Sequence, residues 1–109
     1  MEEWLQIDLL LDRVVGRVAV RASVDHTAWL TSFKLSSYLS DDRHSPRIFL
    51  ENAVVGSEEF VGNSNGFDIV EHDVGPVLAR GVVIHPLTWQ NRIAMQWEIF
   101  TCDGNYCFY

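Results

Sequence analysis

Residues 82–102, VVIHPLTWQNRIAMQWEIFTC, contain two segments with the apolar pattern of β-strands and a polar turn between them. The first segment meets Pro86, which has no N–H for a strand ladder, so we expect that strand to end there. The second, RIAMQWEIF at 92–100, alternates apolar and polar positions with the period of two that strands show. Trp89 stands in the turn, where a large apolar ring is either a structural plug or a contact for a ligand.

The rest of the chain repeats this pattern of short apolar runs bounded by turn residues. SDDRHSP at 40–46 and GNSNG at 62–66 are dense in the residues that turns prefer. Because the sequence has no 3.6-residue apolar stripe, it predicts an all-β, antiparallel sandwich or barrel. The expected strands are EWLQIDLLL at 3–11, VVGRVAVRA at 14–22, WLTSFKLSSYL at 29–39, RIFLENAVV at 47–55, FDIVEHDV at 67–74, VLARGVVIH at 77–85 and RIAMQWEIF at 92–100.

Within these strands the large apolar side chains are expected to pack in the core. Trp4, Phe33 and Trp97 fall in alternating segments, where burial is the commoner role of such residues. Asp8 lies on the first of these strands and is expected to be a structural hydrogen-bonding residue.

Length and charge narrow the class of protein. A chain of 109 residues is one domain at most, with a modest core. Its 15 acidic and 8 basic residues give a formal net charge of −7. Nucleic-acid binding and membrane binding through a polybasic face both need clustered Lys and Arg, so the sequence argues against them.

The sequence contains no constellation typical of an enzyme. Its four histidines lie on separate segments, and the nucleophile motif GxSxG is absent. Adjacent carboxylates such as Glu58 and Glu59 point to opposite faces of a strand or into solvent. Asp41, Asp42 and His44 are a conceivable metal cluster, but a turn capped by its own side chains explains them more simply. We therefore expect a non-enzyme with no metal and no cofactor.

The two cysteines stand near the end of the chain. Cys102 and Cys107 enclose an Asp-Gly turn, so a local disulfide between them is one option. Two free thiols, or a bridge from one of them to a cysteine elsewhere, are the alternatives. The chain has neither the pattern of a signal peptide nor an apolar run long enough for a membrane span.

Several motifs together resemble the coagulation factor V/VIII type C, or discoidin-like, domains. EEWLQIDL is similar to their (D/E)-x-W-L-Q-V-D-L strand, and AWLTSFKLSSYLSDD to W-V-T-S-(F/Y)-K-V-x-Y-S-x-D-G. FVGNSNGFDIVEHDVGPVLARGVVIHPLTW resembles F-x-G-N-x-(D/N) followed by P-(I/L)-x-A-R-(Y/F)-(I/V)-R-I-x-P-x-x-W, and RIAMQWEIFTC resembles I-A-L-R-x-E-(L/V)-x-G-C. The order and spacing hold from residue 3 to residue 102. The resemblance implies a discoidin-like (galactose-binding-domain-like) β-sandwich, or jelly roll, over 1–102, with a C-terminal tail at 103–109.

The sequence departs from the family pattern at several places. The family's domains begin earlier, with a cysteine and further strands, so the resemblance implies an N-terminally truncated domain with an unpaired sheet edge. Cys102 matches the closing cysteine, which in the family usually bridges to that first cysteine. Gly81 replaces an aromatic residue, Thr101 replaces a glycine, and DDRHSPRIF replaces the D-G-x-x-W turn.

The resemblance implies a binding site formed by loops at one end of the sandwich. SVDHTA matches a protruding loop there, and Trp89 lies at the same end. Val24 beside Asp25 is a weak membrane anchor, since burying one valine contributes at most about 1.5–3 kcal/mol and the carboxylate opposes an anionic bilayer. A sugar could stack on Trp89 while Asn91 and Arg92 bond its hydroxyls. The expected ligand-binding residues are Val24, Asp25, His26, Thr27, Trp89, Gln90, Asn91 and Arg92.

The function implied by the resemblance is a non-catalytic, extracellular binding and cell-adhesion module, secreted or at the cell surface and part of a larger multidomain chain. The expected partner is a cell-surface glycan or protein, and no nucleic acid. Anionic phospholipid is the alternative, as is a structural fragment of a mosaic protein that binds nothing. One fold of this class hosts many ligands, so the ligand has to be argued from the site.

Overall fold

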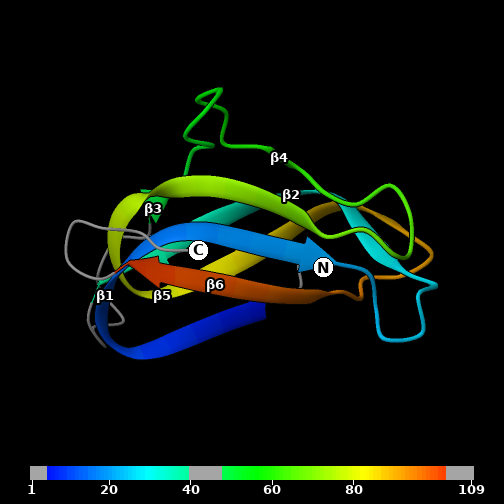
Figure 1. The fold of residues 1–109 in the computed structure, drawn as a ribbon, viewed down its shortest axis with the longest axis horizontal. Helices are drawn as coiled ribbons and strands as arrows, with labels where there is room; N and C mark the ends of the chain where they lie inside the picture. Colours follow the sequence, from blue (N-terminus) through cyan, green and yellow to red (C-terminus); the bar gives the residue numbers. More distant parts are fainter. Residues whose placement is uncertain (1–4, 40–47, 103–109) are drawn as a thin grey trace.

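The computed structural model of the chain describes residues 5–39 and 48–102, and all its regular elements are β-strands (Figure 1). The predicted all-β, antiparallel class is confirmed. The described part of the chain holds no helix with the length and apolar character that a membrane span requires. The strands are β1 (Leu5–Arg21), β2 (Trp29–Tyr38), β3 (Ile48–Phe49), β4 (Phe60–Val61), β5 (Val70–Gln90) and β6 (Gln96–Cys102).

The strands form one continuous antiparallel sheet that folds over into a two-layer sandwich. The strand order is β3-β2-β5-β1-β6, and β4 pairs with β2. Residues 5–8 of β1 pair with 81–84 of β5 in the layer that contains β2, whereas residues 13–20 pair with 70–79 in the layer that contains β6. β1 and β5 therefore belong to both layers, and Figure 1 shows both curling at the same, left-hand end.

The bend in β1 is held by the side chain of Asp8. Its Oδ1 accepts hydrogen bonds from the Leu10 N–H at 2.7 Å and from Arg80 Nε at 2.8 Å. Leu10 has a φ of 71°, in the left-handed region, and the pairing with β5 is interrupted between Asp8 and Arg13. Asp8 is thus a structural hydrogen-bonding residue, which agrees with the sequence-based expectation.

Several expected strand boundaries were wrong. Within the described residues, the two strands expected at 3–11 and 14–22 are one strand, β1 (Leu5–Arg21). The two expected at 67–74 and 77–85 are likewise one strand, β5, which begins at Val70 and continues through Pro86 to Gln90. Pro86 does not end the strand because it pairs with Phe33 beside a register shift, and a strand irregularity accommodates its missing N–H.

The region between β2 and β5 also differs from the expectation. Of the strand expected at 47–55, the described residues 48–55 contain only Ile48–Phe49, and β4 was not expected. The side chain of Asn52 ends the strand pattern, because its Oδ1 accepts hydrogen bonds from the N–H groups of Val54 and Val55 and so closes a turn. The last strand begins at Gln96 rather than at residue 92.

The core lies between the two layers and is centred on Phe33 and Phe60. These rings stack with their centroids 5.5 Å apart, and His72 meets both of them edge-on. Trp97 packs against this core as expected, whereas Trp4 lies outside the described residues. The buried core cluster is Val15, Val18, Val20, Leu30, Phe33, Leu35, Leu50, Phe60, Val74, Ala79, Val82 and Ile84.

Gly81, which stands where the family has an aromatic residue, has a structural explanation. It is paired with Tyr38 across β2 and β5, and a Cβ at this position would collide with the Tyr38 ring. The ring fills the space that a side chain at 81 would occupy, and its hydroxyl accepts a hydrogen bond from Gln6 Nε2 at 2.5 Å.

Replacing Gly62 by alanine is expected to lower the free energy of unfolding by about 3 kcal/mol, the upper end of the usual cost of overpacking. A Cβ at Gly62 would lie 2.9 Å from the carbonyl carbon of Leu30 and 3.2 Å from that of Thr31. Both are backbone atoms of β2, so relief requires the strand to shift. Urea denaturation of the variant measures the loss.

Gly56→Ala is the matched control, because Gly56 has a φ of 71° but open space around its Cα. Its loss is expected to be the smaller one, about 1 kcal/mol, from backbone strain alone. Equal losses in the two variants would contradict the close approach of Gly62 to β2.

Candidate functional site

Three loops meet at the end of the sandwich opposite the bends of β1 and β5. They are residues 22–28 between β1 and β2, residues 62–69 between β4 and β5, and residues 91–95 between β5 and β6. Figure 1 shows them on the right, in cyan, green and orange. Antiparallel pairing brings them together, since the strands that carry them are neighbours in the sheet.

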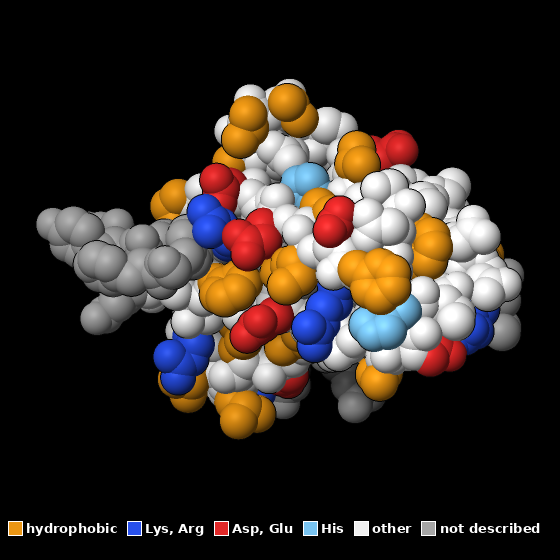
Figure 2. Space-filling view, turned by 45° about the vertical axis from the view of Figure 1, so that its right-hand side comes forward, with side chains coloured by type: hydrophobic (Ala, Val, Ile, Leu, Met, Phe, Trp, Pro, Cys, Tyr) orange, Lys and Arg blue, Asp and Glu red, His pale blue; other side chains and the backbone are white. Residues whose placement is uncertain are grey.

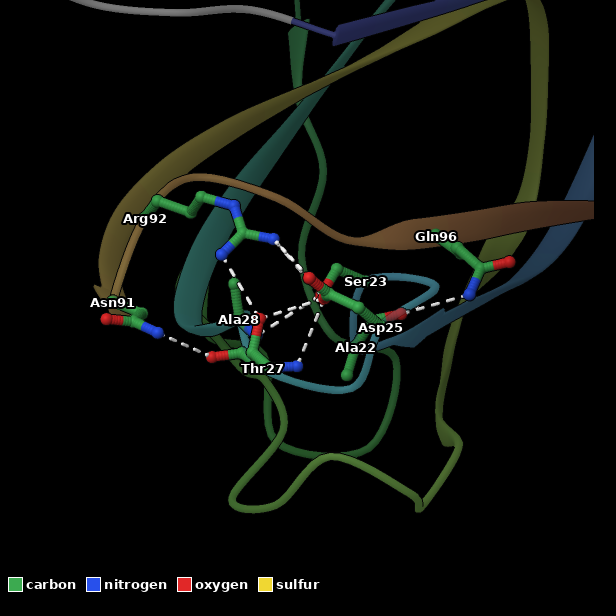
Figure 3. A network of polar contacts seen from close by, with 8 residues as sticks. All are labelled: Ala22, Ser23, Asp25, Thr27, Ala28, Asn91, Arg92 and Gln96. Carbon is green, nitrogen blue, oxygen red and sulfur yellow. Dashed lines mark hydrogen bonds and ion pairs between the residues drawn. The ribbon is translucent and has the colours of Figure 1, made fainter.

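Loops 22–28 and 91–95 are joined by a network that we call the Asp25 clamp, formed by Ser23, Asp25, Thr27, Asn91 and Arg92 (Figure 3). Arg92 Nη2 donates to Asp25 Oδ2 at 3.0 Å and to Oδ1 at 3.2 Å, while its Nη1 donates to Thr27 Oγ1 at 3.1 Å. Asn91 Nδ2 donates to the Thr27 carbonyl at 3.0 Å.

The carboxylate of Asp25 is also the hydrogen-bond acceptor that shapes its own loop. Its Oδ1 accepts hydrogen bonds from the Ser23 hydroxyl at 2.6 Å, from the Thr27 hydroxyl at 2.8 Å and from the Thr27 N–H at 3.2 Å. These hydrogen bonds hold the pKa of Asp25 well below its ordinary value of 3.8. The bond from the Ser23 hydroxyl has the largest effect, followed by the bonds from the hydroxyl and the N–H of Thr27.

Asp25 is therefore expected to stay ionised at pH 3.8, where an ordinary aspartate is half protonated. Because the folded pKa lies below the unfolded one, the ionised carboxylate adds stability above about pH 4, and this contribution is lost as the pH falls through the lowered pKa. The NMR shift of the Asp25 carboxyl carbon, followed during acid titration, measures this. Ser23→Ala is expected to move the midpoint toward 3.8, and a wild-type midpoint already at 3.8 would contradict the clamp.

Loops 22–28 and 62–69 make a separate contact through His26. Its Nδ1–H donates to the Gly66 carbonyl at 2.8 Å, and its ring stacks on Phe67 with a centroid distance of 4.9 Å. A Cβ at Gly66 would collide with the His26 carbonyl, so only glycine permits this close approach. His26 itself has a φ of 63°.

The loop that carries Phe67 is held by its own side chains. Asn65 Oδ1 accepts hydrogen bonds from the N–H groups of Phe67 and Asp68, each at 2.8 Å, and Asn65 Nδ2 donates to Asp68 Oδ2 at 2.7 Å. Asn63 Nδ2 donates to the Asp68 carbonyl at 2.9 Å. The Phe67 side chain, which is 78% exposed, therefore stands on an ordered turn.

Between loops 22–28 and 62–69 lies a cavity of about 220 Å³, which we call the tip notch. Val24, with 80% of its surface exposed, and Phe67 contribute its apolar walls. Figure 2 shows hydrophobic side chains next to His and to Lys or Arg side chains on the face that is drawn. The lining residues are Arg21, Ala22, Val24, His26, Gly66, Phe67 and Gln96.

A second hollow of about 380 Å³ adjoins the tip notch along β1 and β6. Arg21 and Gln96 line both cavities, so they mark the place where the two meet. The other lining residues of this hollow are Ala19, Val20, Ile69, Trp97 and Glu98.

The eight predicted ligand-binding residues lie at this end of the molecule in three groups. Val24 and His26 line the tip notch, while Asp25, Thr27, Asn91 and Arg92 bond to one another. Trp89 and Gln90 are not turn residues, because they end β5 and pair with Leu30 and Trp29. That these eight residues contact a ligand stays a prediction.

Of the seven residues that line the tip notch, sequence reasoning missed five: Arg21, Ala22, Gly66, Phe67 and Gln96. Phe67 was assigned to a strand, and Arg21 was treated as one position of an alternating run. The run of turn residues just before Phe67 was the one available signal, since an Asn side chain caps the backbone two residues on.

The remaining site predictions concern metal and cysteine. Among residues 5–39 and 48–102 there is no group of three or more His, Cys, Asp or Glu side chains placed to hold a metal ion. The conceivable cluster at Asp41, Asp42 and His44 lies outside the described residues. Cys102 is disulfide-bonded, and Cys107 lies outside the described residues.

Comparison with known proteins gives relatives that share discoidin-like regions. No family model matches the chain. Retinoschisin of Takifugu rubripes is 32% identical over 101 residues, which is 92% of this chain and 35% of that protein. Human coagulation factor VIII is 31% identical over 106 residues, covering 94% of this chain and 4% of that protein.

A third relative carries the family in its name. "Discoidin, CUB and LCCL domain-containing protein 2" of Rattus norvegicus is 26% identical over 104 residues, covering 93% of this chain and 13% of that protein. The chain thus spans about a third of the first of these relatives and a smaller share of the other two. The matching regions of the relatives are discoidin, or factor V/VIII type C, domains.

Proposed function

We propose that this chain, which belongs to the discoidin-like (factor V/VIII type C) domain family, is a non-catalytic, extracellular binding and cell-adhesion module. It engages a protein ligand through the loops at one end of the sandwich. The observation that carries this proposal is the pair of exposed apolar side chains, Val24 and Phe67, on either side of the tip notch.

An exposed aromatic ring on an ordered loop favours binding over chance exposure. Exposed apolar clusters on a soluble protein mark interaction sites, and aromatic anchors dominate the energy of protein interfaces. The hydrogen bonds of Asn65 and the stacking on His26 fix Phe67 before a ligand arrives. A preorganised loop of this kind loses little conformational entropy on binding.

The same geometry favours a protein ligand over a glycan. A sugar stacked on Trp89 needs donors from Asn91 and Arg92, but these side chains already donate to Thr27 and Asp25. A sugar bound there would have to share these side chains with the Asp25 clamp. The tip notch offers apolar walls, which suit an apolar side chain of a partner protein.

A membrane surface is the second candidate. Val24 and Phe67 are 80% and 78% exposed and stand on neighbouring loops, so both could enter a bilayer together. Arg92 compensates the charge of Asp25, which removes part of the local repulsion from anionic lipid. The formal net charge of −7 opposes this candidate at long range.

The ligand class is tested by binding the labelled chain to intact cells. A protein ligand predicts that trypsin treatment of the cells removes binding, whereas treatment with glycosidases leaves it in place. Loss of binding after glycosidase treatment alone would support a glycan. Binding that survives both treatments and is reproduced by phosphatidylserine vesicles would support the membrane candidate and contradict a protein ligand.

A further inference from the structure

Arg21 lies at the binding end of the sandwich, but the proposed function gives it no role. It is the last residue of β1 and lines both the tip notch and the adjoining hollow. Its Nη2 donates to Gln96 Oε1 at 3.0 Å, and Gln96 Nε2 donates in turn to the Ala22 carbonyl at 3.1 Å. Figure 3 shows the second of these bonds. This chain of hydrogen bonds fixes the guanidinium at the junction of the two cavities.

The charge of Arg21 is not balanced by a carboxylate in the described part of the chain. Arg17, Arg80 and Arg92 each form an ion pair with an aspartate or glutamate. The described partner of Arg21 is the neutral amide of Gln96. An exposed guanidinium next to an apolar notch offers charge-assisted hydrogen bonds to a ligand anion.

The apolar neighbours of Arg21 define what else such a ligand carries. Val24 and Phe67 line the tip notch together with Arg21, and Ile69 lines the adjoining hollow. The tip notch, at about 220 Å³, lies below the size range of drug-sized pockets and suits a single side chain. Glu98 lines the adjoining hollow and disfavours a second negative charge on the ligand.

We propose that the tip notch recognises an acidic peptide segment of a partner protein. An apolar side chain of that segment enters between Val24 and Phe67, and a neighbouring carboxylate accepts hydrogen bonds from Arg21. The inference rests on the proposed function and names the chemistry of its ligand. A peptide with one carboxylate fits this site better than an anionic bilayer, whose many charges would face Glu98 and the formal net charge of −7.

The test compares two peptides that differ in one charge, acetyl-Phe-Glu-amide and acetyl-Phe-Gln-amide, by following the backbone amide resonances of Val24, His26 and Phe67. The Glu peptide is expected to bind about three- to fivefold more tightly, the effect usual for an ion pair that stays partly in water. Arg21→Gln is expected to abolish this preference. Raising the salt concentration from about 0.05 M to about 0.5 M is expected to reduce it, because salt screens an exposed pair.

Arg13→Gln is the matched control, since Arg13 is an exposed arginine on the same strand but lines neither cavity. This variant is expected to keep the preference for the Glu peptide. Equal binding of the two peptides to the wild-type chain would overturn acidic recognition while leaving the proposed function intact. A preference that survives in Arg21→Gln, or the absence of shifts with either peptide, would also overturn it.

A vesicle experiment distinguishes a peptide carboxylate from a lipid headgroup as the anion that Arg21 binds. If the anion is a lipid headgroup, the wild-type chain sediments with phosphatidylserine vesicles, the Arg21→Gln variant does not, and neither peptide shifts a resonance. This result would assign Arg21 to a lipid headgroup and overturn the proposal.

Discussion

Replacing Phe33 by alanine is expected to lower the free energy of unfolding by about 3–5 kcal/mol. Phe33 is fully buried, stacks on Phe60 at 5.5 Å and meets the His72 ring edge-on. The substitution removes apolar area from the core and leaves a cavity between the layers. Since domains of this size are stable by only about 5–15 kcal/mol, the variant is expected to be close to unfolding at room temperature. Urea denaturation followed by tryptophan fluorescence measures the loss.

Phe49→Ala is the control for that measurement. Phe49 is 45% exposed on the short strand β3, so its loss is expected to be much smaller than that of Phe33. Similar losses in the two variants would contradict the placement of the core between Phe33 and Phe60.

The expected strand at 29–39 is close to the observed β2, because Leu30, Phe33 and Leu35 are all buried in the core even though the pairing with β5 shifts register between Leu30 and Phe33. The four expected strands that make up β1 and β5 were too short. Asp8 and its hydrogen bonds bend β1 without ending it, and the irregularity beside Pro86 lets β5 continue. A strand that bends between two layers presents the same local pattern as two strands joined by a turn, so the sequence cannot distinguish them.

The loops at the binding end could be predicted only in part. The resemblance places Val24 and Trp89 at one end of the sandwich, and the structure agrees. The contact of His26 with Gly66 joins residues 40 positions apart, and no local pattern reveals such a pairing. Phe67 continues an apolar run in the sequence, but the side chain of Asn65 bonds its N–H and draws it into the loop.

The polar residues of the predicted site illustrate a second limit. Asp25 and Arg92 are separated by 67 positions, and each was predicted as a residue that contacts a ligand. In the structure they bond to each other and hold two loops together. Sequence shows which side chains can form hydrogen bonds, but the partner of each is decided by the fold.

The double substitution Val24→Asp with Phe67→Asp is expected to weaken binding to cells at least 30-fold, because loss of one interface anchor alone costs about 2 kcal/mol or more. Both side chains are largely exposed, so the melting temperature of the variant is expected to change little. Titration of the labelled chain on intact cells gives the apparent affinity. Calorimetry of the same samples verifies the folded state.

Val54→Asp with Val55→Asp is the matched control, because these valines are 80% and 73% exposed on the loop between β3 and β4. Measuring both double variants side by side tests most directly whether the three-loop end is the binding surface. We expect the Val24 and Phe67 variant to lose binding and the Val54 and Val55 variant to bind as the wild-type chain does. Retained binding in the first variant and loss in the second would place the binding surface elsewhere on the molecule.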